Sequence, residues 1–469
     1  IITAEVTYPV GNEESIVGWE DASGNLVSSV TLNGSDVTLK AKVEKGHWIT
    51  YDSQGGTYVA PAFVKGGATT TAPAAPTRPG YEFGGWQTKD GAAFTFGQPL
   101  DQALTLYAVW TANTNTRYTV IHWLENADDN EYSYKESETK TGATGAQTNA
   151  AAKSYTGFTA QTIAQQTIAG DGSTIVNVYY KRNVYEVKFY SNSGWFSSPE
   201  EYTSLRITAK YGANISDKWP TYNGSNAWST TDGGSTYQVN IDTMPLNGAK
   251  FYGPKTGSGS ESAYYYGEVL PGESGDTYNG VTYKLHHKDT SPGTGYSVTK
   301  EDKYPITGFT YKEGTANGQS YNNAKFYYTR NSYNIVYVSG GQTVNTASKK
   351  FEESIADAGS YTPTVKPAGM EDYDFGGWHA DPAGEQAYTF TGKTMPAQNV
   401  TVYAKWNKPV YNGTIYLTIE GTGSSITLNV PKGDTIETAL NEKQAEIMAQ
   451  VGKGYTWRGW RTGKDGTGE

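Results

Sequence analysis

One aromatic pattern, Tyr-x-Phe-Gly-Gly-Trp, constrains the fold of this chain more than any other feature. It occurs in full at residues 81–86 and again at residues 373–378. Each copy is followed at a similar distance by a segment of alternating apolar residues that ends in Tyr-Ala-x-Trp. Self-similarity at fixed offsets is typical of tandem arrays of small modules. The chain is therefore expected to fold as a series of small units.

Partial copies of the pattern lie near both ends of the chain, at Gly18-Trp19 and at residues 455–460. A tryptophan at a fixed place in each unit could stack on a sugar or fill the core. A small module without disulfides has little core to spare, so the structural role is favoured, with the neighbouring glycine expected to allow close backbone approach. The predicted structural core residues are Trp19, Tyr81, Phe83, Trp86, Tyr107, Trp110, Tyr373, Phe375, Trp378, Tyr403, Trp406 and Trp460.

Composition narrows the class of protein. The chain has no cysteine, which excludes disulfides and thiolate metal sites. Its formal net charge of −10 disfavours a nucleic-acid partner, because phosphates are bound by basic surfaces. With 38 Tyr and 55 Gly it has the composition of short strands joined by tight turns. It contains no apolar run long enough for a bilayer, so no membrane insertion is expected in this segment.

Recurring strand endings divide the chain into modules. The sequence Tyr-Tyr-x-Arg-Asn closes one module at residues 179–183 and another at residues 327–331, and a new strand follows almost at once. Such short boundaries predict a stiff array with restricted bending. The predicted divisions are 1–43, the C-terminal half of a repeat; 44–112, a complete repeat; 113–183, a separate module; 184–254 and 255–331, two divergent modules; 332–406, a complete repeat; and 407–469, a truncated repeat.

Helix is expected only sparingly. Residues 435–451 place apolar side chains on one helical face after Asp434, a suitable N-cap, and a shorter helix is expected at residues 350–358. Strands, one helix and further strands predict a β-rich α+β fold with the helix on one face of a small mixed sheet. Because the first copy lacks its beginning and the last its end, the chain is expected to be a segment of a longer protein.

Pro-Gly-Tyr-Glu-Phe-Gly-Gly-Trp at residues 79–86, with its closing strand at 107–110, closely resembles the Listeria–Bacteroides repeat, the B-repeat of internalin-type surface proteins. Residues 375–378 and 403–406 carry the same signature. The resemblance implies tandem ubiquitin-like β-grasp modules that form an elongated rod. Residues 113–183 are similar to mucin-binding-protein modules that share the β-grasp plan, whereas residues 184–331 depart from the repeat. Such modules form stalks of surface proteins in Gram-positive and gut bacteria; some bind host glycoproteins, and others only space out a distal head.

Two aromatic clusters outside the repeat are candidate ligand-binding residues. Trp195 and Phe196 lie in a polar, turn-rich segment where apolar rings are normally avoided. Tyr264, Tyr265 and Tyr266 are consecutive, so a strand must present rings on both faces. Exposed aromatic clusters often mark binding surfaces. The alternative is that both clusters fill insertions peculiar to their modules.

Signals for catalysis or metal binding are lacking in the sequence. It contains no Gly-x-Ser-x-Gly elbow, phosphate-binding loop or Cys/His pair, so no enzyme activity and no cofactor are expected. The acidic turn at residues 126–131 lacks the spacing of a calcium loop. His286 and His287 are adjacent and would face opposite sides of a strand, so no metal is expected.

The resemblance, taken together with these patterns, implies a stalk and adhesion segment of a secreted, wall-associated bacterial surface protein. The expected partners are flanking repeats of the same chain and a mucin-like host glycoprotein or glycan. Two alternatives stay open. The segment could be a pure spacer, or the accessory region of a large secreted enzyme whose catalytic domain lies outside it.

Overall fold

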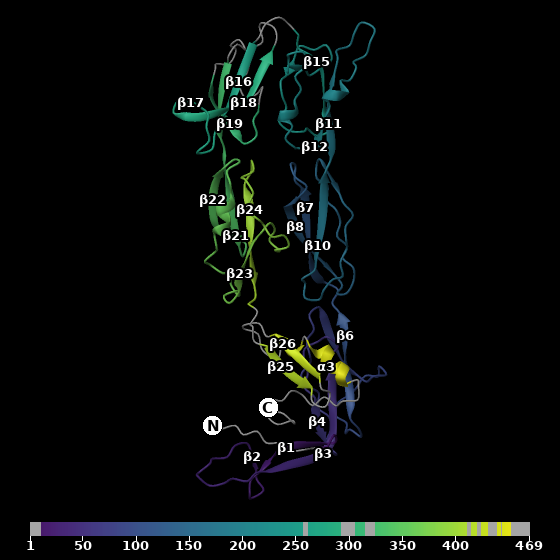
Figure 1. Ribbon diagram of the computed structural model, residues 1–469. Helices are drawn as coiled ribbons and strands as arrows, with labels where there is room; N and C mark the ends of the chain where they lie inside the picture. The colour runs from purple at the N-terminus through teal and green to yellow at the C-terminus, as the bar shows by residue number, and fades with distance from the viewer. Residues whose placement is uncertain are drawn as a thin grey trace.

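A computed structural model describes residues 11–256, 261–291, 305–314, 324–409, 414–419, 424–429, 439–441 and 443–451. The described chain is β-rich and forms several small mixed sheets (Figure 1). Trp460 and Asp434, both named in the sequence analysis, lie outside these residues.

The strands group into consecutive modules. Module 1 contains β1 (Glu14–Glu20), β2 (Leu26–Val27), β3 (Lys40–Asp52), β4 (Ala62–Lys65), β5 (Tyr81–Gln87) and β6 (Leu104–Ala112). Module 2 contains β7 (Thr116–Glu125), β8 (Tyr132–Gly142), β9 (Phe158–Ala160) and β10 (Ile175–Arg182). Module 3 contains β11 (Val184–Tyr190), β12 (Ile207–Lys210), β13 (Trp228–Ser229), β14 (Tyr237–Gln238) and β15 (Ala249–Pro254), with 3₁₀ helices η1 (Thr203–Leu205) and η2 (Ser216–Lys218).

Module 4 contains β16 (Glu261–Glu268), β17 (Asp276–Tyr278), β18 (Val281–Ser291), β19 (Phe309–Gly314) and β20 (Ala324–Arg330). Module 5 contains β21 (Ser332–Ser339), β22 (Gln342–Lys350), the 3₁₀ helix η3 (Ala356–Ser360), β23 (Asp374–His379) and β24 (Val400–Asn407). The last described elements are β25 (Thr414–Ile419), β26 (Ser424–Asn429) and α3 (Gln444–Val451).

All five modules have the same central strand pair. An early strand of the module lies parallel to its last long strand, as in β3 with β6, β7 with β10 and β11 with β15. The pairs β16 with β20 and β21 with β24 repeat this arrangement. Because the strand that enters and the strand that leaves run in the same direction, the chain enters each module at one end and leaves at the other. Modules 1, 2 and 3 are thereby stacked end to end, and so are modules 4 and 5 (Figure 1).

The long strand β3 crosses the predicted division between residues 43 and 44. Its first part pairs with β1, whereas its second part pairs with β4 and β6. The strand therefore links the first hairpin to the first Tyr-x-Phe-Gly-Gly-Trp unit without an intervening loop.

The Gly-Gly of the repeat forms a β-bulge. Phe83 pairs with Trp110, but Trp86 pairs with Ala108, so β5 carries one residue more than its partner β6. Phe83 and Trp86 are three positions apart and would face opposite sides of a regular strand. The extra residue turns both rings into the same core, where their centroids lie 5.4 Å apart. Gly85, at φ +107°, provides the backbone conformation that this bulge needs.

The role of this glycine in the structure differs from the role expected from the sequence. A side chain at Gly85 would meet nothing within 4 Å, so the position requires glycine for its dihedral angle and not for close backbone approach. Gly377 has the same role in the bulge of β23. Its φ angle is +95°, and a Cβ atom added there would meet nothing within 4 Å.

Asparagines join three pairs of consecutive modules. In each junction the asparagine N–H donates to the carbonyl of a glycine just before the next-to-last strand of the module just completed. The asparagine carbonyl accepts an N–H from a residue shortly after the second strand of the next module. These bonds are between 2.8 and 2.9 Å long and link Asn113 with Gly80 and Thr144, Asn183 with Gly157 and Tyr211, and Asn331 with Gly308 and Phe351.

Charged side chains reinforce the junction between modules 2 and 3. Arg182 Nε donates to the carbonyl O of Glu125 at 2.7 Å, and its Nη1 donates to the carbonyl O of Tyr211 at 2.8 Å. Lys210 Nζ lies 2.9 Å from the Glu125 carboxylate. The junction between modules 4 and 5 repeats these bonds with Arg330, Glu268, Phe351 and Lys350.

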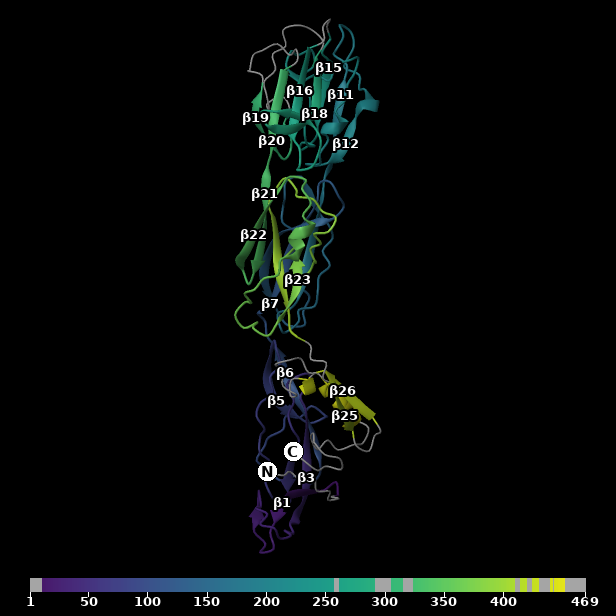
Figure 2. The same ribbon diagram turned by 60° about the vertical axis from the view of Figure 1, so that its left-hand side comes forward.

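The stacked modules form two columns that lie side by side (Figures 1 and 2). Modules 1, 2 and 3 form the first column. The chain reverses direction between β15 and β16, and modules 4 and 5 form the second column. Contacts between the columns include Asn226 Nδ2 to Asp289 Oδ1 at 2.8 Å and the rings of Tyr134 and Tyr403 at 5.9 Å. The last elements, β25, β26 and α3, lie against module 1, where Asn441 accepts a hydrogen bond from the backbone of Tyr58.

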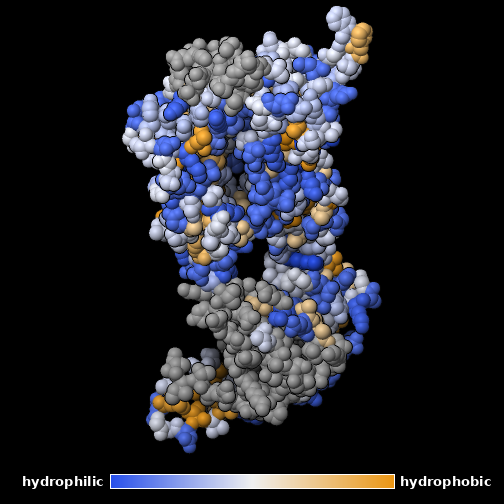
Figure 3. All heavy atoms as spheres, turned by 45° about the horizontal axis from the view of Figure 1, so that its top comes forward, coloured by the Kyte–Doolittle hydropathy of each residue, from blue (hydrophilic) through white to orange (hydrophobic). Residues whose placement is uncertain are grey.

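Each described module buries its own core and leaves a mostly hydrophilic surface (Figure 3). The helix predicted at residues 350–358 is not an α-helix. β22 continues to Lys350, Glu352 takes a left-handed backbone conformation at φ +65°, and only the 3₁₀ helix η3 follows. Ile355 is nevertheless fully buried there against Met395, so the connection covers the sheet without an α-helix.

Candidate functional site: a pocket between the two columns

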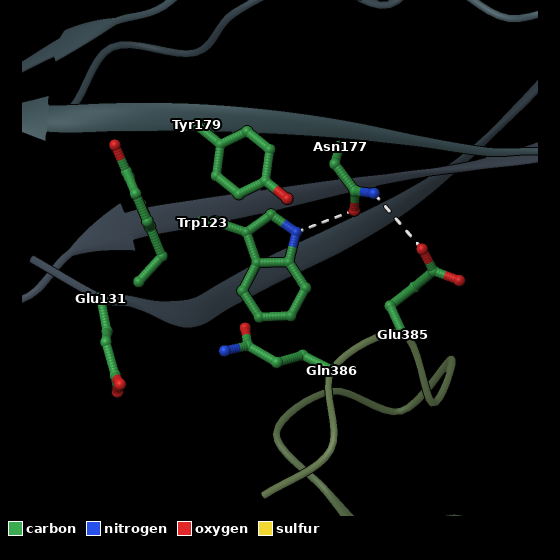
Figure 4. A pocket seen from close by; sticks show the side chains of 7 residues that line it. Trp123, Glu131, Asn177, Tyr179, Glu385 and Gln386 are labelled. Carbon is green, nitrogen blue, oxygen red and sulfur yellow. Dashed lines mark hydrogen bonds between the residues drawn. The ribbon is translucent and has the colours of Figure 1, made fainter.

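A pocket of about 360 Å³ lies where module 2 meets module 5 (Figure 4). The strands of module 2 provide Trp123 from β7, Tyr132 from β8, and Asn177 and Tyr179 from β10. Glu131 precedes β8. Glu385 and Gln386 come from the loop between β23 and β24, on the other column. The pocket therefore combines residues that are about two hundred positions apart in the chain.

Strand periodicity places the module 2 residues on this face. Val176, Val178 and Tyr180 point into the core of module 2 and are buried, so Asn177 and Tyr179 between them point outward. Tyr179 is 41% exposed, whereas its neighbour Tyr180 is 1% exposed. The adjacent tyrosines of the Tyr-Tyr-x-Arg-Asn ending thus have different roles, one in the core and one on the surface.

The aromatic side chains of the pocket support one another. The rings of Trp123 and Tyr179 are nearly parallel, with centroids 6.4 Å apart, and Tyr132 meets Tyr179 edge-on at 5.0 Å. Trp123 is only 2% exposed. It therefore forms the floor of the pocket, and Tyr179 and Tyr132 offer the ring surface that a ligand can reach.

A hydrogen-bond chain crosses the pocket from one column to the other. Trp123 Nε1 donates to Asn177 Oδ1 at 2.8 Å, and Asn177 Nδ2 donates to Glu385 Oε2 at 3.3 Å (Figure 4). The indole fixes the orientation of the amide, and the amide holds the carboxylate at the side of the pocket. On the rim, Lys393 Nζ lies 3.8 Å from Glu131 Oε2 and provides a further link between the columns.

Buried Asp381 fixes the loop that carries Glu385 and Gln386. Its carboxylate accepts the backbone N–H groups of Glu385 and Gln386 at distances between 2.9 and 3.1 Å. The pocket is acidic, because its lining residues include two glutamates and neither lysine nor arginine. Burial raises the pKa of the Tyr179 hydroxyl, and the negative charge of Glu385 raises it further, so this hydroxyl stays protonated and can donate.

Aromatic rings beside an amide, a hydroxyl and carboxylates suit a polar ligand with an apolar face. Such a ligand can stack on the rings while its hydroxyl groups bond to the polar side chains. No group of three or more His, Cys, Asp or Glu that could hold a metal ion is found among the described residues.

The ligand candidates from the sequence lie elsewhere. Trp195 and Phe196 are 94% and 98% exposed in the loop after β11. Tyr265 is fully buried in the core of module 4, while Tyr264 and Tyr266 face the other side of β16. Tyr266 stacks on Tyr327 at 5.3 Å, and Tyr264 has Lys288 Nζ 5.2 Å from its ring centroid. The structure does not bring these two clusters together, because they belong to different sheets.

The tryptophans of the two full repeats lie in module cores. Trp86 and Trp378 are buried and pack against Tyr51 and Tyr337, with ring centroids 4.8 and 5.0 Å apart. The remaining members of the predicted set in the described chain are half-buried: Trp19, Tyr81, Phe83, Tyr107, Trp110, Tyr373, Phe375, Tyr403 and Trp406. Of these, Tyr403 also contacts Tyr134 across the columns.

Sequence reasoning missed the pocket and also a tryptophan equivalent to the repeat tryptophans. Trp228 of module 3 is fully buried on a short strand beside β15, and its Nε1 donates to the Pro220 carbonyl as Trp378 Nε1 donates to that of Tyr361. The shared Thr-Met-Pro sequences at residues 243–245 and 394–396 signal this likeness, since Met244 and Met395 occupy the two cores. The sequence signal nearest to the pocket was the pair of adjacent tyrosines, Tyr179 and Tyr180.

The described fold defines a tandem array of small, mixed β-sheet modules. Residues 47–109 and 333–405, which cover most of β3 to β6 and of β21 to β24, match the Listeria–Bacteroides repeat domain. The resemblance drawn from the aromatic motif is thereby confirmed for these two modules. Among the described helices, none has the length and apolar character needed to cross a membrane.

Proposed function

We propose that this chain is a stalk and adhesion segment of a bacterial cell-surface protein, exposed outside the cell and associated with the wall. Two matched Listeria–Bacteroides repeats support the surface location, because such repeats occur in bacterial surface proteins. The proposal assigns no catalytic activity to the segment itself.

We propose further that the modules are reduced β-grasp units. The strand order of modules 2 and 5, second-first-last-third, supports this assignment. The connection that crosses the sheet is a loop or a 3₁₀ helix in the modules described. Module 2 would then be the mucin-binding-like unit, and each column, not the whole chain, would be the rod-like element.

The observation that carries the adhesive part of the proposal is the pocket between modules 2 and 5. Tyr179 and Tyr132 offer ring faces, and Asn177, Glu385 and Gln386 offer hydrogen-bonding groups around them. A neutral sugar on a host glycoprotein has the matching chemistry, with apolar C–H faces and hydroxyl rims. Sialylated and sulfated sugars fit less well, because the pocket and the chain are both acidic.

Binding of the whole chain to a panel of neutral and acidic glycans, including mucin glycopeptides, tests this proposal. The expected result is saturable binding of a neutral glycan that weakens at least about tenfold in Tyr179→Ala, which removes the exposed ring. Trp195→Ala serves as the comparison, since its ring is exposed outside the pocket. If Trp195→Ala weakens glycan binding and Tyr179→Ala does not, the pocket is not the adhesive site.

A pure spacer is the second candidate, and the junctions favour it. Three junctions use the same asparagine backbone bonds, and two of them add the same Arg, Lys and Glu side chains. If no glycan in the panel binds above background, the segment is better described as a stiff spacer. An accessory region of a secreted enzyme would also be a stiff spacer. The presence of a catalytic domain elsewhere in the same polypeptide would identify this alternative.

A further inference from the structure

Two neighbouring aromatic side chains are almost completely exposed at the tip of a loop. Trp195 and Phe196 lie between β11 and η1 and are 94% and 98% exposed. Two large adjacent rings are unfavourable in water, because burying them would remove their apolar surface from the solvent. Both rings are therefore available to a partner that could bury them.

The loop that carries the rings, residues 191–201, is held in a defined conformation. Its base is closed by the Ser191 N–H, which donates to the Glu200 carbonyl at 2.9 Å. Next to the rings, the Gly194 N–H donates to the Ser197 carbonyl at 3.0 Å. The Ser193 N–H donates to Asp232 Oδ1 at 2.7 Å and ties the loop to a second loop of the same module. The rings are therefore presented by a braced hairpin.

The tip is convex and cannot enclose a ligand. Gly194 and Ser197 flank the rings, and their backbone groups are used in the turn. A sugar site needs polar side chains that converge around the ring, as in the pocket between modules 2 and 5. A convex pair of rings is suited instead to entering an apolar medium. Trp in particular favours the boundary between lipid headgroups and acyl chains.

Charge selects the kind of lipid. Glu200, Glu201 and Asp232 lie on or beside the loop, and the whole chain has a net charge of −10. Three cations lower the pKa of Glu201: Arg206, Lys188 and Lys250. Arg206 pairs with Glu201 at 2.7 Å and Lys188 pairs with Glu186 at 3.3 Å, so both add little free positive charge, and Lys250 Nζ lies 6.0 Å from the Tyr190 ring centroid. Anionic headgroups would be repelled, whereas zwitterionic headgroups would not.

The loop also has the position needed to reach a flat surface. β11 and β15 both run toward the end of the molecule where the chain reverses, opposite to the first and last described elements, β1 and α3 (Figure 1). The space-filling view shows a narrow projection with hydrophobic atoms at its tip standing out from this end (Figure 3).

We propose that the 191–201 loop is a membrane-docking tip that inserts Trp195 and Phe196 into the headgroup region of a zwitterionic, phosphatidylcholine-type bilayer. The docking is peripheral and reversible, because two rings bury far less apolar surface than a lipid anchor. It is separate from the proposed glycan site and does not depend on it.

Flotation of the whole chain with phosphatidylcholine vesicles at millimolar lipid tests the proposal. The expected result is partial binding that changes little between low and high salt. The double variant Trp195→Ser/Phe196→Ser should reduce the partition coefficient by about tenfold to a hundredfold, because the rings contribute most of the buried apolar area. Val365→Ser removes another exposed apolar side chain, far from the tip in module 5, and should bind like the wild type.

Three results would overturn the proposal. One is absence of binding to phosphatidylcholine vesicles, and another is equal binding by the double variant. The third is concentration-dependent self-association of the wild type that the double variant loses, without vesicle binding, since the rings would then dock on a second copy. Sedimentation of both proteins without lipid distinguishes this last case.

Discussion

Gly85 and Gly377 decide where the repeat tryptophans point. Each lies in a bulge that adds one residue between an aromatic residue and the tryptophan. Without the bulge, Phe83 and Trp86 would face opposite sides of β5, and one large ring would leave the core. The conserved spacing of the motif within this chain therefore reflects a backbone requirement as much as a choice of side chains.

Replacing Gly85 by alanine is expected to destabilise module 1 by about 1–2 kcal/mol, although the new methyl group has free space. The cost comes from the positive φ angle. Gly84→Ala is the matched control, because this neighbour has no positive φ and its Cβ would meet Val109 at ordinary contact distance. Calorimetric unfolding of both variants measures the difference, and equal stability of the two would contradict the dihedral argument.

Trp86→Ala is expected to destabilise module 1 by about 3–5 kcal/mol, because it leaves a large cavity beside Tyr51 and Phe83. Trp195→Ala removes the same side chain from a fully exposed position and should change the unfolding free energy by no more than about 0.5 kcal/mol. Calorimetry together with hydrogen exchange of the β5 and β6 amides assigns the loss to module 1. If Trp86→Ala unfolds like the wild type, its ring is not a core residue.

At the scale of elements, the junctions explain how short connections become stiff. A single asparagine between two strands could act as a hinge, but its N–H and carbonyl are both bonded, one to each module. Arg182 and Arg330 then bond to backbone carbonyls of the two modules that they separate. Bending at the junction would break several of these bonds together.

The junctions between modules 2 and 3 and between modules 4 and 5 are expected to loosen in acid. Burial alone would raise the pKa of Glu125, but the bonds from Lys210 and from the Arg182 N–H outweigh it and hold the pKa below its ordinary value. Glu268 is affected in the same way by Lys350 and Arg330. Because the pKa of each carboxyl group is lower in the folded state, the stabilisation is fully present at pH values above the unfolded-state pKa. It is lost as the pH falls through the folded-state pKa.

Calorimetry and small-angle scattering from neutral pH down to about pH 3 measure this loosening. The double variant Glu125→Gln/Glu268→Gln should be less stable than the wild type at neutral pH and should lose less stability on acidification. Glu371→Gln is a control at an exposed carboxylate whose pKa is also lowered, but by local backbone bonds within module 5. If the wild type and the double variant lose stability in the same way as the pH falls, the two glutamates are not the source of the pH dependence.

At the scale of the whole molecule, the sequence predicted the modules better than their arrangement. Period-two alternation, turn glycines and repeated endings all act within a few dozen residues, so they indicated the sheets and the array. The pairing of the columns depends on isolated contacts such as Asn177 with Glu385 and Asn226 with Asp289, between residues 208 and 63 positions apart. Such contacts leave no periodic pattern, so the sequence could indicate at most an outward-facing Tyr179 and not the pocket that this residue lines together with Glu385 of the other column.

The absence of α-helix at residues 350–358 has a similar origin. The segment has a helical apolar spacing, but Lys350 already completes the antiparallel pairing of β22 with β21. The backbone of Glu352 bonds to Met395, and Met395 bonds back to Glu353, which holds the start of the segment in a turn that is not α-helical. Tertiary pairing outweighed local propensity, and Ile355 reached the core from a 3₁₀ turn.

The paired columns themselves are open to a direct test, which the lack of cysteine makes simple. Lys135→Cys and Lys405→Cys place spin labels on exposed positions, one residue after Tyr134 and two residues after Tyr403, whose rings meet across the columns at 5.9 Å. Pulsed dipolar spectroscopy should give a short, narrow distance distribution. Adding Tyr134→Ala and Lys393→Glu removes the ring contact and turns the attraction between Lys393 and Glu131 into repulsion, so the distribution should become longer and broader.

Lys366→Glu is the matched control, because it makes the same charge change at a lysine that bonds only within module 5. It should leave the inter-column distance unchanged. A wild-type distribution that is already long and broad would mean that the columns separate in solution, and the pocket between modules 2 and 5 would then have no fixed geometry. A short distance that survives in the Tyr134→Ala/Lys393→Glu variant would instead place the main holding contacts at the interface of modules 3 and 4, where Asn226 bonds to Asp289.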